Sequence, residues 1–250
     1  MVVAPPSPQD PLAPLVALPG VTDAVARVRD ALVAVHNLPA NRRGFAANAA
    51  ESALRGARAS AAIDGAPLTT TDLVSEPLLA GAARVADEHA RLVPVWKAAP
   101  LQALARMHVL AAADLVPADR HADELGRPRP GTSDRLALLA DLVTGGTRVP
   151  APVLVAVVHG ELLALAPFGT ADGVVARAAA RLAATASGLD VKSLAVPEVG
   201  HLRALAEYRA TAASFAGGGA DGVRAWVLHC CSQWEAGARE ATSIAGARSS

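Results

Sequence analysis

Apolar residues recur three and four positions apart along most of the chain, a spacing that places them on one face of an α-helix. Alternation with a period of two, which would indicate half-buried strands, is scarce. The pattern therefore predicts an all-α protein. The predicted helices cover residues 21–36, 43–63, 71–98, 101–115, 135–143, 150–165, 173–187, 201–215 and 221–245.

Residues that start or stop helices separate these segments. They comprise Asp64-Gly65 before Pro67, a capping box formed by Thr69 and Asp72, the Pro- and Gly-containing stretch 128–131, Gly145-Gly146 and residues 217–219. Residues 1–20 contain six prolines, so we expect them to form a flexible N-terminal arm. We expect residues 21–245 to form a single helical domain, followed by a flexible tail at 246–250.

The composition argues against several classes of partner. Lys and Arg together number 23, as do Asp and Glu, so the chain lacks the positive charge of a general nucleic-acid-binding protein. Aromatic residues make up only 3% of the chain, which disfavours stacking on bases. The longest apolar stretch, around residues 153–158, is shorter than the ~18 residues of a membrane span, and the N-terminus lacks the basic start of a signal peptide. We therefore expect neither nucleic acid nor a membrane as a partner.

The two cysteines, Cys230 and Cys231, are neighbours in the last predicted helix and cannot join distant segments by a disulfide. This usage is typical of a reducing compartment, so we expect a cytoplasmic protein. His229 beside them suggests a metal site, but adjacent helical residues point in different directions and no second ligand pair has zinc spacing. We interpret both cysteines as core residues. An apolar stripe in the same helix supports this, formed by Val223, Trp226, Cys230 and Trp234.

Gly217, Gly219 and Gly222 match the pattern G-x-G-x-x-G, which is typical of NAD-dependent oxidoreductases. In those enzymes the pattern follows a buried strand and opens a helix within a βαβ unit. Here the preceding residues have a helical pattern, and the rest of the βαβ unit is missing. An NAD-dependent oxidoreductase is therefore the third and weakest interpretation of this chain.

Residues 162–182 read LLALAPFGTADGVVARAAARL, which predicts a helix, a short loop and a second helix. The N-terminus of a helix presents unpaired N–H groups and a partial positive charge, so a loop of small residues leading into it can hold an anion. A plain turn between two packed helices gives the same pattern. The local sequence alone leaves both interpretations open.

This loop and an earlier segment together resemble the Fic family, a helical fold whose active members transfer AMP from ATP to target hydroxyl groups. The signature loop of the family reads H-P-F-x-[DE]-G-N-G-R-x-x-R. Pro167, Phe168, Gly173 and Arg177 match it. The resemblance covers residues 43–245, with residues 104–108 similar to the helix before the family's flap and residues 208–226 similar to its C-terminal helical pair. It implies an all-α, Fic-like helical domain, which in the family can carry a short flap hairpin.

Fic proteins with an N-terminal inhibitory helix carry the motif [ST]-x-x-x-E-[GN] on it. Ser60 and Gly65 match the ends of this motif, and Asp64 stands where the family has glutamate. In inhibited members that glutamate pairs with the second arginine of the signature loop. The resemblance thus implies an ion pair between Asp64 and Arg177, although Asp64-Gly65 could also simply cap the end of a helix.

The chain departs from the signature loop at the positions that carry the chemistry. Ala166 replaces the base histidine, Thr170 the metal-binding acid, Ala171 the first glycine, Asp172 the asparagine and Val174 the first arginine. Loss of a general base alone costs roughly 10²- to 10⁴-fold in rate. Active relatives use ATP and Mg²⁺, but these changes also remove the charges that would hold them. We therefore expect no catalytic residue, no metal and no cofactor here.

The interpretation that follows is a catalytically degenerate Fic-fold protein that acts by binding or regulation. We expect a protein partner, and the sequence leaves a homo-oligomer open. The alternative is residual binding of a nucleotide or phosphate ligand, with altered nucleotidyl- or phosphotransferase activity. For the loop itself, we expect Phe168 to point into the core and residues 169–173 to lie at the surface.

Overall fold

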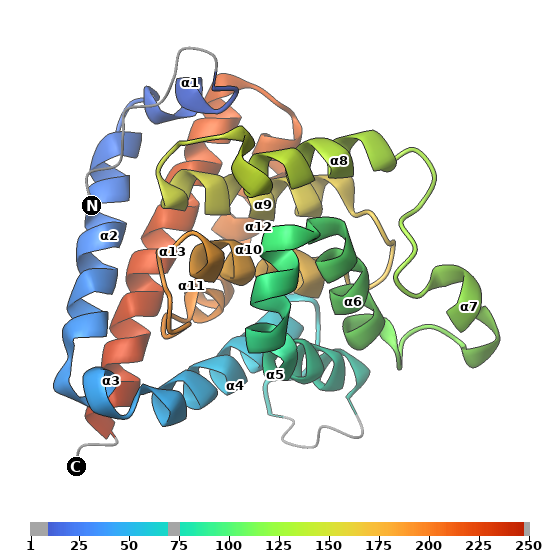
Figure 1. The fold of residues 1–250 in the computed structure, drawn as a ribbon, viewed down its shortest axis with the longest axis horizontal. Helices are drawn as coiled ribbons and strands as arrows, with labels where there is room; N and C mark the ends of the chain where they lie inside the picture. Colours follow the sequence, from blue (N-terminus) through green and yellow to red (C-terminus); the bar gives the residue numbers. More distant parts are fainter. Residues whose placement is uncertain (1–9, 70–75, 248–250) are drawn as a thin grey trace.

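The computed structural model describes residues 10–69 and 76–247, and all the regular structure within them is helical (Figure 1). The first half contains α1 (Ala13–Val16), α2 (Val21–Asn37), α3 (Pro39–Arg43), α4 (Phe45–Ile63), α5 (Pro77–Ala98), α6 (Pro100–Ala112), the 3₁₀ turn η1 (Ala118–Arg120) and α7 (His121–Glu124). The second half contains α8 (Ser133–Asp141), the π-helical turn η2 (Leu142–Gly146), α9 (Ala151–Leu165), α10 (Asp172–Ala186), α11 (Pro197–Arg203), α12 (Leu205–Ala216) and α13 (Ala220–Ala247). The all-α prediction is confirmed.

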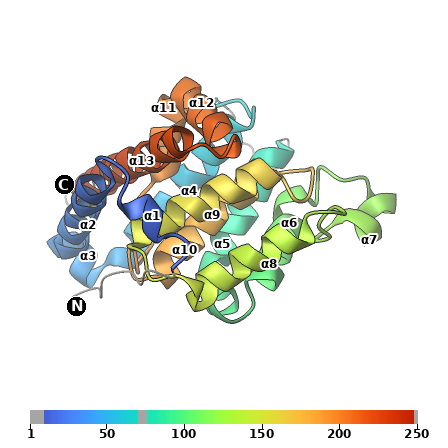
Figure 2. The ribbon, with the colours of Figure 1, turned by 90° about the horizontal axis from the view of Figure 1, so that it is seen from above.

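Helices α9 and α10 form the centre of the bundle (Figures 1 and 2). Residues 155–160 of α9 are all buried, so this helix is enclosed on every side instead of showing one apolar stripe. Helix α10 packs against α9 and also against α4, α5 and α6, while α12 and α13 cover another side of α9. The residues that join α9 to α10 are therefore held from several directions.

Helix α13 is the longest element and packs against α2 along much of its length (Figure 1). The indole Nε1 of Trp226 donates a 2.8 Å hydrogen bond to the carbonyl oxygen of Ala156 in α9. A Cβ atom at Gly160 would come within 2.6 Å of that indole nitrogen, so only glycine allows this close packing. Cys230 and Cys231 are free and buried, which confirms that both are core residues.

Several predictions about local structure differ from the structure. Within residues 10–20, predicted as part of a flexible arm, the chain forms α1, and the Asp10 carboxylate anchors it to residues 147 and 148, just before α9. Asp10 accepts hydrogen bonds from Thr147 Oγ1 (2.7 Å), the Arg148 amide (2.5 Å) and the Leu12 amide (2.9 Å). Residues 1–9 of the predicted arm lie outside the described residues. At the other end of the chain, α13 continues to Ala247 and includes the start of the predicted tail.

The helix predicted at 201–215 is two helices, α11 and α12, which meet at Ala204. Helix α11 begins at Pro197, a residue favoured in the first turn of a helix. It packs against both α4 and α13, so the chain must turn before α12 can reach α9. The helix predicted at 71–98 is described from Pro77 onwards, and Asp72 of the predicted capping box lies outside the described residues.

The segment between α6 and α8 contains η1 and α7 in place of the flap hairpin that the family can carry, and no strand occurs in the described ranges. Figure 2 shows α7 projecting beyond the bundle at the end where α9 and α10 are joined. None of the helices in the described part of the chain combines the length and apolar character needed to cross a membrane.

Three histidines are buried together between α9, α11 and α13. His201 Nδ1 lies 3.2 Å from His229 Nε2, and the rings of His159 and His201 meet edge to face with centroids 5.1 Å apart. Burial lowers the pKa of all three, and neighbouring positive charges lower those of His159 and His201 further. The folded protein thus keeps these rings neutral to a lower pH than the unfolded chain does, where histidine titrates near pH 6.5. For His229 the Glu207 carboxylate, 3.3 Å from its Nδ1, partly offsets this effect.

We expect acid to destabilise the protein below about pH 6.5, because the unfolded state then binds protons that the buried rings cannot. Stability should be complete above that pH and fall as the pH drops, by about 1.4 kcal/mol per pH unit for each such histidine. The measurement is the free energy of unfolding by urea between pH 8 and pH 4.5. The variant His159→Gln should flatten this pH dependence. An equal slope in the natural chain and in the variant would contradict the prediction.

Candidate functional site

The loop between α9 and α10 reverses the chain within a few residues through three left-handed backbone conformations. Ala166 ends α9 with φ of 42°, Gly169 has φ of 79°, and Ala171 begins α10 with φ of 52°. An alanine in this region is strained, which costs of order 1 kcal/mol or more and persists only where the surroundings enforce it. The loop is therefore held by its contacts rather than by its own preference.

The Asp172 carboxylate fills the inside of the loop. Its Oδ1 accepts a hydrogen bond from the Phe168 amide (2.9 Å), and its Oδ2 accepts one from the Gly169 amide (2.7 Å). Burial raises the pKa of Asp172, as does the nearby Asp64, while the two amides lower it. Two N–H groups of the loop that could bind an external anion, those of Phe168 and Gly169, are thus bound by the protein's own side chain, whereas no side chain caps the first turn of α10.

Phe168 is buried and stacks on His108 of α6, with ring centroids 4.2 Å apart and an angle of 6° between the planes. The amide of Gly126, beyond α7, donates a 2.9 Å hydrogen bond to His108 Nδ1. Burial lowers the pKa of His108 to about 4, so the ring is neutral at physiological pH and Nδ1 stays an acceptor. The predicted burial of Phe168 is confirmed, and residues 169–173 are exposed or half-buried as expected.

Arg129 closes the outer edge of the loop. Its amide donates to the Pro167 carbonyl oxygen (2.7 Å), and its Nη2 donates to the Ala166 carbonyl oxygen (2.5 Å). Its side chain also lies against Gly169, where an added Cβ would meet the Arg129 Cδ at 3.3 Å. These contacts hold the segment between α7 and α8 against Ala166 and Pro167, the first two residues of the loop.

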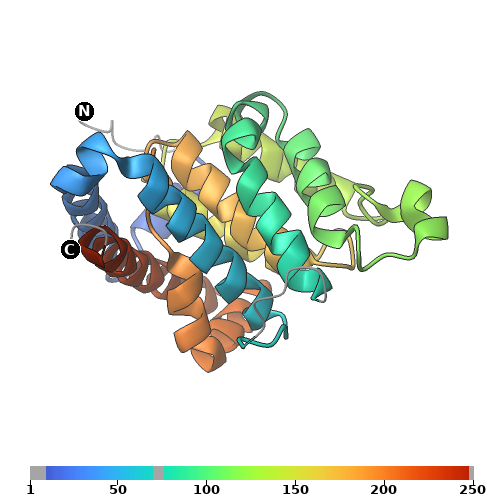
Figure 3. The ribbon, with the colours of Figure 1, turned by 90° about the horizontal axis from the view of Figure 1, so that it is seen from below.

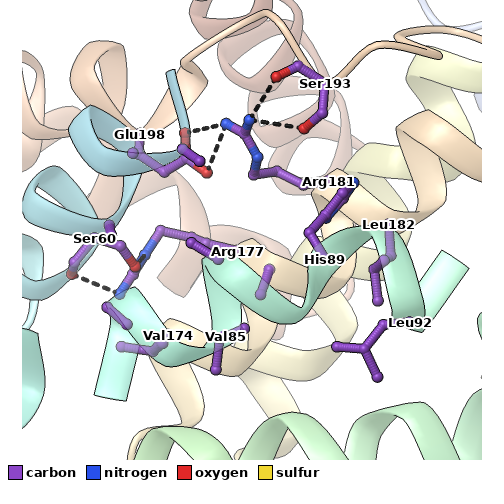
Figure 4. Close-up of a pocket in the computed structure, with 16 residues that line it drawn as sticks. Ser60, Val85, His89, Leu92, Val174, Arg177, Arg181, Leu182, Ser193 and Glu198 are labelled. Carbon is purple, nitrogen blue, oxygen red and sulfur yellow. Dashed lines mark hydrogen bonds and ion pairs between the residues drawn. The ribbon is translucent and has the colours of Figure 1, made fainter. Parts of the chain in front are cut away.

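Arg177 lies one turn further along α10, with only 2% of its side chain exposed. Its Nη2 donates to Asp64 Oδ2 (2.7 Å) and to the Ser60 carbonyl oxygen (2.9 Å). Its Nε donates to Ser60 Oγ (2.8 Å) and its Nη1 to the Tyr208 hydroxyl oxygen (3.2 Å). The predicted ion pair between Asp64 and Arg177 is present, and Figure 4 shows Ser60 and Arg177 on one wall of a small cavity.

Gly173 allows the Asp64 carboxylate to reach this position. A Cβ atom at Gly173 would lie 2.5 Å from both carboxylate oxygens of Asp64, so a side chain there would displace the Asp64 carboxylate from this position. Gly65, the next residue after Asp64, has φ of 112°, a conformation that suits glycine and ends α4. Gly65 and Gly173, which both match the Fic motifs, therefore allow Asp64 at the end of α4 to contact α10.

Tyr208 extends this contact into the histidine cluster. Burial raises the pKa of its hydroxyl, which therefore stays protonated, and its oxygen lies 2.9 Å from His159 Nε2. Because Arg177 donates to the tyrosine oxygen, the tyrosine hydrogen is free to bond to the neutral histidine. A continuous polar chain thus runs from Asp64 through Arg177 and Tyr208 to His159.

Three residues of this site were not predicted from the sequence. His108 and Tyr208 lay in segments that resembled Fic helices, but neither matched a motif. Arg129 lay in a Pro- and Gly-rich stretch interpreted only as a loop. The single tyrosine of the chain, in a sequence with three phenylalanines and three tryptophans, was the one available signal.

The structure also bears on the other candidates. Gly217 and Gly219 lie between α12 and α13, and Gly222 lies within the first turn of α13. A helix and not a strand precedes them, so the NAD pattern lacks the context it requires. No cluster of three or more His, Cys, Asp or Glu side chains in the described ranges is arranged to hold a metal ion. The loop thus remains the site with the most specific geometry.

The residues of the loop do not fit Mg²⁺ and ATP. Thr170 and Val174 supply no charge where the resemblance implies an acid and an arginine. Asp172 places a carboxylate against the amides that would otherwise face a phosphate. Arg177, the one matched cation, already donates from all three nitrogens to protein groups.

Removing the Arg177 guanidinium should cost about 3–5 kcal/mol of unfolding free energy, because Ser60 and Tyr208 lose their donor along with Asp64. The variant Asp64→Asn should cost less, about 1–3 kcal/mol, since the carboxylate is 24% exposed and the guanidinium keeps its other partners. Urea denaturation of Arg177→Met, Asp64→Asn and the double variant measures these costs. The double variant should lose less than the sum of the single losses.

The exposed arginine of the Arg91–Glu88 pair in α5 provides the control, and Arg91→Met should leave stability unchanged. Strictly additive losses at Asp64 and Arg177 would show that the pair carries no coupling energy.

Solved structures show what this arrangement is similar to. A Fic family protein from Desulfovibrio desulfuricans G20 superposes with a TM-score of 0.72 at 20% sequence identity, over 90% of this chain and 74% of the other. Fic-1 from C. elegans superposes with the same TM-score of 0.72 at 18% identity, over 95% of this chain and 76% of the other. No family model matches the sequence, and no curated protein matches it significantly. At this level of identity the likeness establishes the architecture, and the chain therefore has the fold of Fic family proteins.

Proposed function

We propose that this protein is a Fic-fold protein without AMP-transfer activity that acts by binding or regulating a protein partner. The observation that carries the proposal is the loop, in which Ala166 replaces the expected base and Asp172 occupies the amides inside the turn. A methyl group cannot accept the proton that a target hydroxyl must lose.

The histidine that contacts the loop does not offer a substitute base. His108 stacks on Phe168, but it is 1% exposed, and one face of its ring is covered by that phenyl ring. Its Nδ1 accepts the Gly126 amide hydrogen. A base must come within about 3 Å of the proton it takes, and a target hydroxyl cannot approach a ring held in this way.

A nucleotide or phosphate ligand bound without AMP transfer is the second candidate. The observation in its favour is an open groove of about 580 Å³ between the ends of α4 and α9 and the length of α12. Asp64, Arg177, Tyr208 and Arg209 line it. The groove is large enough for a nucleoside, but its fully engaged Arg177 and the exposed Asp64 carboxylate disfavour a triphosphate.

Purified protein should transfer no AMP to itself or to proteins of a cell lysate. Incubation with ATP labelled on the α-phosphate and Mg²⁺, followed by gel autoradiography, measures this, with heat-unfolded protein as the background. Ala166→His alone should also be inactive, since Thr170, Asp172 and Val174 still fail to hold the metal and the phosphates.

A positive comparison is a variant with the whole signature restored and Asp64 removed, by Ala166→His, Thr170→Asp, Ala171→Gly, Asp172→Asn, Val174→Arg and Asp64→Ala. Activity in this variant, but not in Ala166→His alone, would show that the fold supports AMP transfer and that the natural loop sequence does not. Transfer by the natural chain or by Ala166→His would overturn the proposal.

Thermal unfolding distinguishes the two candidates. A ligand that binds only the folded state at a hundredfold excess over Kd stabilises it by about 2.7 kcal/mol, which raises Tm by several degrees. We expect ATP, ADP, AMP and NAD, each at millimolar concentration with Mg²⁺, to leave Tm unchanged. A rise with one nucleotide that Tyr208→Phe or Arg209→Gln abolishes would favour nucleotide binding. In that case, identifying the nucleotide would come before a search for a protein partner by affinity capture from cytoplasmic extract.

A further inference from the structure

A second hollow lies away from the loop, between α4, α5 and the chain that follows α10. It measures about 600 Å³, within the range of roughly 300–1,000 Å³ typical of small-molecule sites. Its walls are mainly alanine and valine, because the facing positions of α4 and α5 are small. Figure 3 shows α4 and α5 next to α10 on this side of the molecule. Two of its lining residues are large exposed hydrophobics, Phe45 (41%) and Val191 (58%).

Lys192 provides a positive charge at the edge of this hollow. Its Nζ donates a 2.8 Å hydrogen bond to the Asn41 carbonyl oxygen and lies 5.3 Å from the centre of the Phe45 ring. These contacts fix the ammonium group but do not neutralise it, and it forms no ion pair with any residue that the structure describes. An ammonium group has three donors, so two remain for a ligand.

The inner end of the hollow offers no further charge to a ligand. It adjoins the cavity of about 40 Å³ drawn in Figure 4, and the two share the lining residues Ala53, Ala57, Ala86, His89 and Ser193. The arginines of that cavity are already bound: Arg181 donates to Glu198 (3.0 Å) and to the Ser193 carbonyl oxygen (3.1 Å), and Arg177 donates to Ser60 and Asp64.

Asp87 is the remaining charged residue that lines the hollow, and it is exposed on α5. Its negative charge would repel an anion, so an anionic head group is favoured only at the edge formed by Lys192 and Phe45. A ligand that suits all these features has an aliphatic body for the alanine walls and one negative group for Lys192.

We propose that the hollow between α4 and α5 binds an aliphatic carboxylate, with its chain along the alanine walls and its head group on Lys192. Burial of the chain supplies affinity, and the ammonium group supplies the preference for an anion. This site does not involve the signature loop, so the proposal is independent of whether the protein transfers AMP.

The probes are decanoate and decylamine, both below their micelle-forming concentrations, titrated into the full chain by calorimetry. We expect decanoate to bind at a single site and decylamine to bind at least about tenfold more weakly, because only the carboxylate accepts a charge-assisted hydrogen bond from Lys192 and a second cation is repelled there. Lys192→Gln should weaken decanoate binding by a similar factor. Lys97→Gln is the matched control, because Lys97 is the other lysine of the chain and lies exposed at the end of α5, outside the hollow.

Ala86→Phe fills the hollow and should abolish binding of both probes without changing the helical circular dichroism. If that variant unfolds, Ala90→Phe, at an exposed position of the same wall, replaces it. Absence of decanoate binding, equal binding of decylamine, or unchanged binding by Lys192→Gln would each overturn the proposal. Dimerisation of the natural chain in light scattering that Ala86→Phe abolishes would also overturn it, by assigning the hollow to a second copy.

Discussion

The buried guanidinium of Arg177 is the interaction on which the arrangement of this site depends. A cation enclosed by helices is stable only if its donors are paired, and here Ser60, Asp64 and Tyr208 supply the acceptors from α4 and α12. These partners fix the spacing of α4, α10 and α12. Gly173 is a consequence of the same constraint, because any side chain at that position would collide with Asp64.

The loop before Arg177 is closed by the protein's own groups. Asp172 takes the amides of Phe168 and Gly169, Arg129 holds the carbonyl oxygens of Ala166 and Pro167, and His108 stacks on Phe168. Each contact stabilises a backbone turn that contains two strained alanines. The amides of Phe168 and Gly169 and the carbonyl oxygens of Ala166 and Pro167 are thus paired within the protein, which supports the proposal that this loop does not transfer AMP.

Much of the fold could be predicted from the spacing of apolar residues. The limits of α2, α9 and α10 agree with prediction to within one residue at each end, because each has a strong apolar pattern between clear helix breaks. Prediction failed where a distant contact decides the outcome. The Asp10 side chain holds a proline-rich segment against the residues that lead into α9. The packing of α11 on α4 and α13 divides a stretch whose apolar pattern predicts one helix.

The residues of the site could be named from the sequence: Pro167, Phe168, Gly173 and Arg177 in the loop, Asp64 on the earlier helix, and no base at Ala166. Side-chain chemistry follows directly from residue identity. The partners of these groups depend on how the helices pack. Tyr208, His108 and Arg129 lie between 31 and 60 positions away from the site residues they contact, and helix packing alone brings such distant groups to within hydrogen-bonding and stacking distance.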